Sequence, residues 1–200
     1  MNEAFQRKVR GISRRQILQG GAATAVAVSC IANMANALSP PDRTDVMKLN
    51  DLIEALRMTE KEVCLTAANQ LANRASAPTE FDLHLRRAGL DEGDAVSIAG
   101  ALNNLSRTGG PTIRSFSVSY NPNIREGGAI ALINSLPKTV TEIGMVGCGL
   151  GDESGKVLWT WAQHAAALRM LCVEQNKYTP HMRQKISDLR KNRNGLVVIV

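Results

Sequence analysis

The chain has 200 residues, of which 44% are hydrophobic, and a formal net charge of +6. This length suits one domain with a buried core and is short for two. From Leu38 onward, 19 basic side chains stand against 17 acidic ones, so most of the excess charge belongs to the first 37 residues. The near-neutral remainder gives no indication of a nucleic-acid partner.

The N-terminal segment has the order of an export signal. Arg14 and Arg15 precede two apolar residues, an uncharged stretch rich in Ala and Gly follows, and Ala-Asn-Ala at 35–37 has the small-x-small form of a cleavage site. This order resembles a bacterial twin-arginine (Tat) signal peptide over residues 1–37, with cleavage after Ala37. The resemblance implies recognition by the Tat translocation machinery and a periplasmic mature protein.

Other interpretations of this segment stay open. Cys30 follows Ala-Val-Ser, which resembles a lipoprotein cleavage box with Ala27 where Leu is usual, and lipidation there would make the protein a membrane-anchored envelope component. A spanning anchor fits less well, because such a helix needs about 20 predominantly apolar residues. Proteins exported by this route often fold around a cofactor, so the resemblance also leaves open an enzyme or a cofactor-dependent subunit.

The cysteines after the export segment do not form a metal or redox motif. Cys64, Cys148 and Cys172 are an odd number with no C-x-x-C spacing, so at least one thiol stays free or pairs between chains. We therefore predict small buried residues rather than a disulfide framework.

Residues 38–79 are predicted to be a linker followed by two helices. After the linker at 39–44, apolar residues recur at helical spacing up to Leu56. Thr59 and Glu62 have the form of a capping box in front of a second amphipathic pattern. We expect these helices to cover the exposed end of the structure that begins at residue 80.

An internal repeat with a period near 28 residues follows, with segments that begin at Glu80, Ile113, Val140 and Leu168. Each segment, or unit, opens with alternating apolar residues, continues through a turn and ends in a helix-like pattern. The alternation predicts short strands. Their inward residues are Leu83, Leu85, Phe116, Val118, Ile143, Met145, Leu171 and Val173. The helix-like pattern of the first unit adds Val96, Ile98 and Leu102, and the apolar run from Leu196 predicts a fifth strand.

This register resembles the leucine-rich repeat, and the long helix in each unit resembles the ribonuclease-inhibitor-like subclass. Asn121, Cys148 and Asn176 stand at the consensus Asn/Cys position, where their side chains would satisfy backbone groups at the bend between units; Ala88 departs from it. The resemblance implies an α/β solenoid over residues 80–200: about four strand-turn-helix units, a parallel concave sheet and a helical N-terminal cap.

The resemblance also implies that the concave face binds a protein partner. The candidate binding residues alternate with the inward ones. They are His84, Arg86, Arg87, Arg114, Ser117, Ser119, Tyr120, Glu142, Arg169, Cys172 and Glu174. Arg and Tyr are enriched among interface hot spots, so the arginines and Tyr120 are the first candidates. The alternative is that all of these are solvated strand positions without a partner.

The sequence does not match the motifs for catalysis or cofactor binding that its glycines and histidines suggest. The glycine-rich stretch at 142–157 has Leu150 where a phosphate loop of the Walker type needs Gly, and Val157 where it needs Ser or Thr. The three histidines have no metal-ligand spacing, and no G-x-S-x-G occurs. Acidic pairs such as Asp91-Glu92 stand where helices begin, which indicates capping. We predict no catalytic residue, metal or cofactor, and hence a non-enzymatic protein.

Basic residues gather near the C-terminus. They are Lys177, Arg183, Lys185, Arg190, Lys191 and Arg193. A solvated helix is the simpler interpretation, and a weak interaction of this helix with anionic surfaces is the functional one.

Overall fold

The structure is a computed structural model that describes residues 43–73 and 79–200. The expected export segment, with Arg14, Arg15, Cys30 and the cleavage site after Ala37, lies outside the described residues. Of the helices in the described part, none is long and apolar enough to cross a membrane.

The described residues form a parallel five-stranded sheet and six α-helices. The elements in chain order are α3 (Arg43–Met58), α4 (Glu62–Ala72), β1 (Glu80–His84), α5 (Glu92–Arg107), β2 (Thr112–Ser117), α6 (Arg125–Ser135), β3 (Glu142–Gly144), α7 (Asp152–His164), β4 (Met170–Cys172), α8 (Pro180–Ser187), the 3-10 helix η1 (Asp188–Asn192) and β5 (Val197–Ile199). The strands lie side by side in the order of the sequence, and each pair is parallel. The expected α/β class with a parallel sheet is confirmed.

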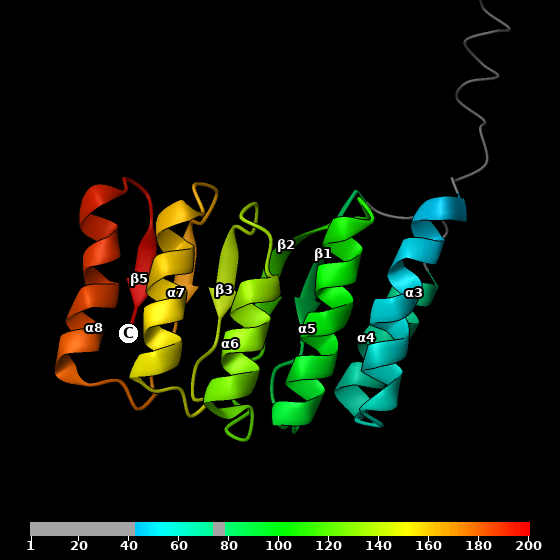
Figure 1. The fold of residues 1–200 in the computed structure, drawn as a ribbon, viewed down its shortest axis with the longest axis horizontal. Helices are drawn as coiled ribbons and strands as arrows, with labels where there is room; N and C mark the ends of the chain where they lie inside the picture. Colours follow the sequence, from blue (N-terminus) through cyan, green and yellow to red (C-terminus); the bar gives the residue numbers. More distant parts are fainter. Residues whose placement is uncertain (1–42, 74–78) are drawn as a thin grey trace, which may run out of the picture. The chain divides into compact units, whose positions relative to one another are not determined.

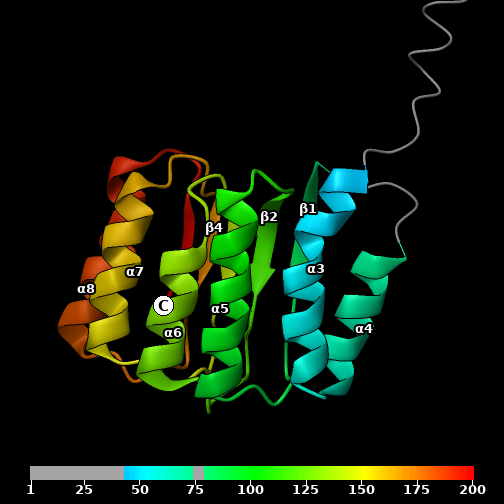
Figure 2. The ribbon, with the colours of Figure 1, turned by 45° about the vertical axis from the view of Figure 1, so that its right-hand side comes forward.

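The helices that connect the strands, α5 to α8, all lie on one side of the sheet (Figure 1). At the β1 end, α3 packs against both α4 and α5 (Figure 2). The core fills the space between the helices and the sheet. The other side of the sheet, called the outer face below, carries no helix formed by the described residues.

The period-two alternation correctly identified the strand residues that face the core. All eight predicted inward residues, from Leu83 to Val173, are at most 1% exposed. The helix pattern was wrong at Val96, which is 50% exposed. The buried face of α5 runs through Ala95, Ile98, Ala99 and Leu102, and Val96 lies about 100° around the helix from Ala95.

Helix N-termini are capped within and between units. The predicted capping box of Thr59 and Glu62 is wrong, because α4 begins after Lys61 without a side-chain cap and the Thr59 hydroxyl donates instead to the carbonyl of Leu56. Asp91 does cap α5, in a reciprocal box with Asp94. The next caps cross between units. The Glu126 carboxylate of α6 accepts the Ser154 amide at 2.7 Å, and Asp152 accepts the Thr179 amide at 2.8 Å.

Candidate functional site

The bends that follow the strands hold the units together through buried side chains. Asn121 accepts the Leu90 amide at 3.0 Å and donates to the carbonyls of Leu85 and Val118 at 2.9 and 2.7 Å. Asn121 itself is fully buried, so each of these bonds forms in a dry environment. The prediction that this side chain satisfies backbone groups between units is confirmed.

The same role is played by Asn176 and, more weakly, by Cys148. The Asn176 amide oxygen accepts the backbone amides of Cys148 and Leu150 at 2.9 and 3.1 Å, and its nitrogen donates to Met145 and Val173 at 2.8 Å each. The Cys148 thiol lies 3.2 Å from the Val118 carbonyl. Burial raises the pKa of this thiol to about 11, so it stays protonated and unreactive at neutral pH.

The outer face presents two rows of side chains fixed by the strand register. The first row contains Asp82, Ser115, Glu142, Met170 and Val197, and the second contains His84, Ser117, Gly144, Cys172 and Ile199. Neighbours in a row come from adjacent strands about 4.8 Å apart. Residues far apart in the sequence therefore form one continuous surface.

A hydrogen-bonded chain crosses the first three strands of this face. His84 Nε2 lies 2.9 Å from the Ser115 hydroxyl, which donates to Glu142 Oε2 at 3.0 Å. Because the hydroxyl proton is directed to Glu142, His84 acts as donor to Ser115. A nucleophilic serine requires the reverse, with histidine accepting the proton. The chain is a polar ladder across the sheet, and its geometry does not activate Ser115.

Arg114, one of the candidate binding residues, is neutralised on the sheet. Its Nε and Nη2 donate to the two carboxylate oxygens of Asp82 at 3.0 and 2.6 Å. This bidentate hydrogen bond lowers the pKa of Asp82. A partner would have to compete with Asp82 for the guanidinium, so Arg114 is the weakest of the arginine candidates.

Arg86 and Arg87, by contrast, have no ion pair with any carboxylate of the described residues. Their guanidinium carbons lie 4.5 and 5.0 Å from the centroid of the Tyr120 ring. These cation–π contacts hold two positive charges beside one aromatic side chain. The structure thus brings three predicted binding residues from two units into one cluster, called the Arg-Tyr cluster below.

Two residues of the cluster, Arg87 and Tyr120, belong to a row of residues with left-handed backbone. Arg87, Tyr120, Gly147 and Gln175 each stand two residues after the last inward strand residue of their unit, with φ of 54°, 63°, 60° and 60°. The amide of Tyr120 donates to the carbonyl of Val146, so neighbouring bends are hydrogen-bonded. Non-glycine residues rarely adopt this conformation, and its recurrence at one position shows that the same bend follows each of the strands β1 to β4.

Apolar side chains occupy the opposite end of the outer face. Met170, Val197 and Ile199 are 40%, 49% and 46% exposed, and Cys172 is half-buried beside them. Six large hydrophobic side chains of the described residues are this exposed, and half of them lie on β4 and β5. A concentration of this kind distinguishes an interaction surface from scattered surface residues.

The remaining candidate binding residues fall at the margins of this face. Arg169 is exposed immediately before β4, and Ser117 is half-buried, with its hydroxyl 3.3 Å from that of Ser119. Glu174 is half-buried, and its Oε2 has no hydrogen-bond partner in the described part of the chain. The prediction that Ser119 lies on the accessible face is wrong. It is 4% exposed and accepts the Val146 amide, because the chain already bends inward where the strand ends.

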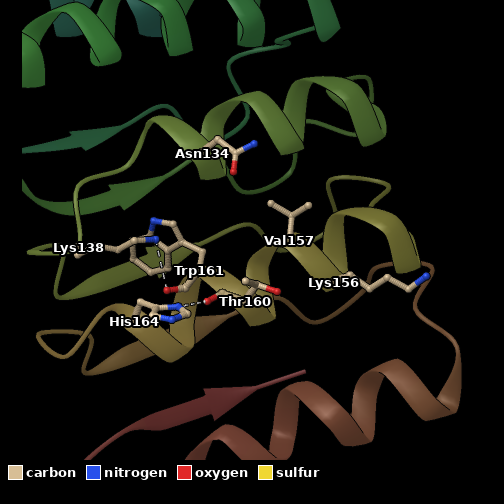
Figure 3. A pocket seen from close by; sticks show the side chains of 7 residues that line it. All are labelled: Asn134, Lys138, Lys156, Val157, Thr160, Trp161 and His164. Carbon is tan, nitrogen blue, oxygen red and sulfur yellow. Dashed lines mark hydrogen bonds between the residues drawn. The ribbon is translucent and has the colours of Figure 1, made fainter.

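The helical side carries groups that the sequence did not indicate. A shallow cavity of about 370 Å³ lies between α6 and α7, with Lys138, Trp161 and His164 at one end and Lys156 at the other (Figure 3). The Lys138 ammonium lies 4.5 Å from the Trp161 ring centroid, and desolvation lowers its pKa. The Lys138–Trp161 contact joins α7 to the loop that follows α6, so helical periodicity within one unit cannot reveal it.

Most of the C-terminal basic cluster is used within the fold. Arg193 donates to the carbonyls of Ala162 and Ala165 at the end of α7, and Arg183 donates to the carbonyl of Tyr178. Lys185 lies 3.9 Å from the Trp159 ring centroid, and Lys191 pairs with Asp188. These bonds account for four of the six basic side chains and favour the interpretation as a solvated helix.

No group of His, Cys, Asp and Glu among the residues 43–73 and 79–200 is arranged to hold a metal ion. Cys64, Cys148 and Cys172 are all free thiols, and burial raises the pKa of each. No known protein-family model matches the chain, and no curated protein is significantly similar to it in sequence. The function of the candidate site is therefore inferred from the geometry of this chain alone.

Proposed function

We propose that this is an exported, non-enzymatic leucine-rich-repeat protein that binds another protein through the outer, concave face of its sheet. The observation that carries the binding proposal is the outer face itself. It combines two unpaired guanidiniums on Tyr120 with exposed apolar side chains on β4 and β5. Such a mixture of arginine, tyrosine and apolar side chains is typical of protein interfaces.

The repeat assignment is supported by features that recur in register. Strands β1 to β4 are each followed, three residues after their last residue, by a residue of left-handed backbone, and each strand pairs in parallel with the next one in the sequence. Asn121 and Asn176 form equivalent buried bonds to the bends of two neighbouring units. Repeats of this kind are stabilised mainly by contacts between neighbours.

The helical segment before β1 fits the role of an N-terminal cap. Leu49, Leu52 and Leu56 of α3 are at most 2% exposed, and α3 packs against α5. Lys61, at the start of α4, forms an ion pair of 2.6 Å with Asp94 of α5, which raises the pKa of Lys61. The segment thereby covers an apolar edge of the first unit, as a terminal repeat requires.

Export is proposed from the sequence alone, on the resemblance of residues 1–37 to a Tat signal. The mature protein is then periplasmic, with lipidation at Cys30 as the alternative. Intact mass spectrometry of protein purified from the envelope separates the two: cleavage after Ala37 gives a chain that begins at Leu38, and lipidation gives an acylated chain that begins at Cys30.

Partner binding is tested by affinity capture from a periplasmic extract with paired variants. Met170→Arg places a charge on the outer face, and Val96→Arg places the same charge on α5, at residues of similar exposure. We expect a protein captured by the wild-type chain and by Val96→Arg to be lost with Met170→Arg. Equal capture by all three chains, or no specific capture, contradicts the proposed function.

A further inference from the structure

We propose that the outer face recognises an extended segment of the partner that is acidic at one end and apolar at the other. A carboxylate of this segment binds between Arg86 and Arg87, and its apolar end covers the exposed side chains of β4 and β5. This inference rests on the proposed function, because it names the chemistry of the partner that the same face would bind.

The Arg-Tyr cluster is the only part of the described outer face with uncompensated positive charge held in place. Arg114 is already paired with Asp82, whereas the guanidiniums of Arg86 and Arg87 lie over the Tyr120 ring and form no ion pair with a described residue. Two like charges beside one ring repel each other, and a carboxylate between them removes this repulsion. Guanidinium groups bind carboxylates through two parallel hydrogen bonds, and stacking on an aromatic ring leaves those donors free.

The remainder of the face argues against a ligand that is acidic along its whole length. Glu142 is exposed on β3, and Glu174 is half-buried with a carboxylate oxygen that lacks a hydrogen-bond partner in the described residues. A polyanion such as a nucleic acid or an anionic lipid surface would approach both carboxylates. Like-charge juxtaposition of this kind is strongly unfavourable. Negative charge on the ligand is therefore favoured beside the Arg-Tyr cluster and disfavoured beside Glu142 and Glu174.

The middle of the face allows a peptide backbone to pass closely. Gly144 and Gly147 are the central residues there, and neither carries a side chain. A Cβ at Gly147 would lie 3.4 Å from the Tyr120 ring, at van der Waals distance, so the ring lies directly beside this glycine. The two glycines thus leave backbone without side chains between the Tyr120 ring and Cys172, along the path toward Ile199.

The dimensions of the sheet fit a short peptide. Four strand spacings of about 4.8 Å separate β1 from β5, which makes about 19 Å. An extended chain rises about 3.3 Å per residue, so about six residues cross the face. A segment of that length can place a carboxylate at Arg86 and Arg87 and an apolar side chain at Ile199.

The test uses a display library of random eight-residue peptides selected on the immobilised full chain. We expect enriched peptides to carry Asp or Glu at one end and apolar residues at the other. Synthetic copies are then measured by fluorescence polarisation. The double variant Arg86→Gln/Arg87→Gln should weaken their binding about tenfold or more, as expected for the loss of charge-assisted hydrogen bonds. Raising the salt concentration should weaken the wild-type complex in the same direction.

The matched control is Arg107→Gln/Arg190→Gln, which removes the same charge from exposed residues of α5 and η1. It should leave peptide affinity within about twofold. Enriched peptides without acidic residues, or an affinity that the Arg86/Arg87 variant leaves unchanged while Met170→Arg abolishes it, overturn this inference and leave the proposed function standing. A selection that yields no peptide dependent on either variant contradicts both.

Discussion

The bends between units and the outer face of the sheet use polar side chains in opposite ways. At the bends, both amide atoms of Asn121 and of Asn176 are bonded to the backbone of two neighbouring units. On the outer face, Arg86 and Arg87 have no ion pair among the described residues, and their guanidiniums lie over an aromatic ring. The hydrogen-bonding atoms of the bend side chains are thus paired within the fold, whereas the guanidinium donors of the two arginines remain available to a ligand.

Apolar side chains also fall into two groups, one buried in the fold and one exposed on the outer face. The eight predicted inward residues of the first four units are at most 1% exposed, whereas Met170, Val197 and Ile199 on the outer face are 40–49% exposed. Burial of apolar surface stabilises the fold, and exposed apolar surface contributes little until another molecule covers it. Stability and binding should therefore respond to different substitutions, and the following experiments separate them.

The largest loss of stability is expected at the bends. Asn176→Ala leaves two backbone amides and two carbonyls without partners, so the free energy of unfolding should fall by about 3–5 kcal/mol. Asn121→Ala, which removes three bonds, should cost less. Urea denaturation followed by circular dichroism measures both. Asn103→Ala, at an exposed position of α5, is the control, and a loss at Asn176 no larger than at Asn103 would show that the bonds do not hold the units together.

A smaller effect is expected from Cys148 at alkaline pH. Burial raises the pKa of its thiol from 9.0 to about 11, so the unfolded chain loses the proton at lower pH than the folded chain. The stabilisation is fully present below pH 9 and is lost as the pH rises toward 11, by about 2–3 kcal/mol. Denaturation midpoints measured between pH 8 and pH 11 should fall more steeply for the wild-type chain than for Cys148→Ala. Parallel pH profiles for the two chains contradict the prediction.

The cap that crosses from α6 to α7 should contribute less again. Glu126 accepts the Ser154 amide at 2.7 Å, and its replacement by alanine should lower the free energy of unfolding by about 1 kcal/mol. Glu153→Ala removes a charge from an exposed position in the first turn of α7 and serves as the control. Equal effects in thermal denaturation would mean that the helix dipole, rather than the bond between units, accounts for the loss.

Much of the fold could be read from the sequence because short-range periodicity determines it. Alternating apolar residues identified the inward strand positions, and the recurrence of the pattern every 28 residues or so indicated parallel strands joined by helices. The buried roles of Asn121 and Asn176 also followed from their position in the unit. In each case the property depends on the spacing of residues along the chain, either within one unit or from one unit to the next, and a sequence displays this spacing directly.

The candidate site was less accessible to this reasoning. The alternation rule extends only to the end of a strand, and beyond it the bends at residues such as Tyr120 turn Ser119 into the interior. The rule also treats all outward arginines alike, although Arg114 is paired with Asp82 and Arg86 is not. The Trp161 contact with Lys138 joins α7 to the loop that follows α6. Each of these features depends on contacts between side chains of different units. The periodicity within one unit therefore does not predict them.

The smallest stability effect is expected on the outer face, where the comparison is sharpest. Arg86 and Arg87 form no ion pair within the described residues, and two like charges at one ring repel each other, so Arg86→Gln/Arg87→Gln should change the free energy of unfolding by less than about 0.5 kcal/mol. Urea denaturation at low and high salt measures it, with Arg107→Gln/Arg190→Gln as the charge-matched control. A loss as large as that of Asn121→Ala would mean that the Arg-Tyr cluster holds the first two units together, and the division between a fold-building bend and a free binding face would not stand.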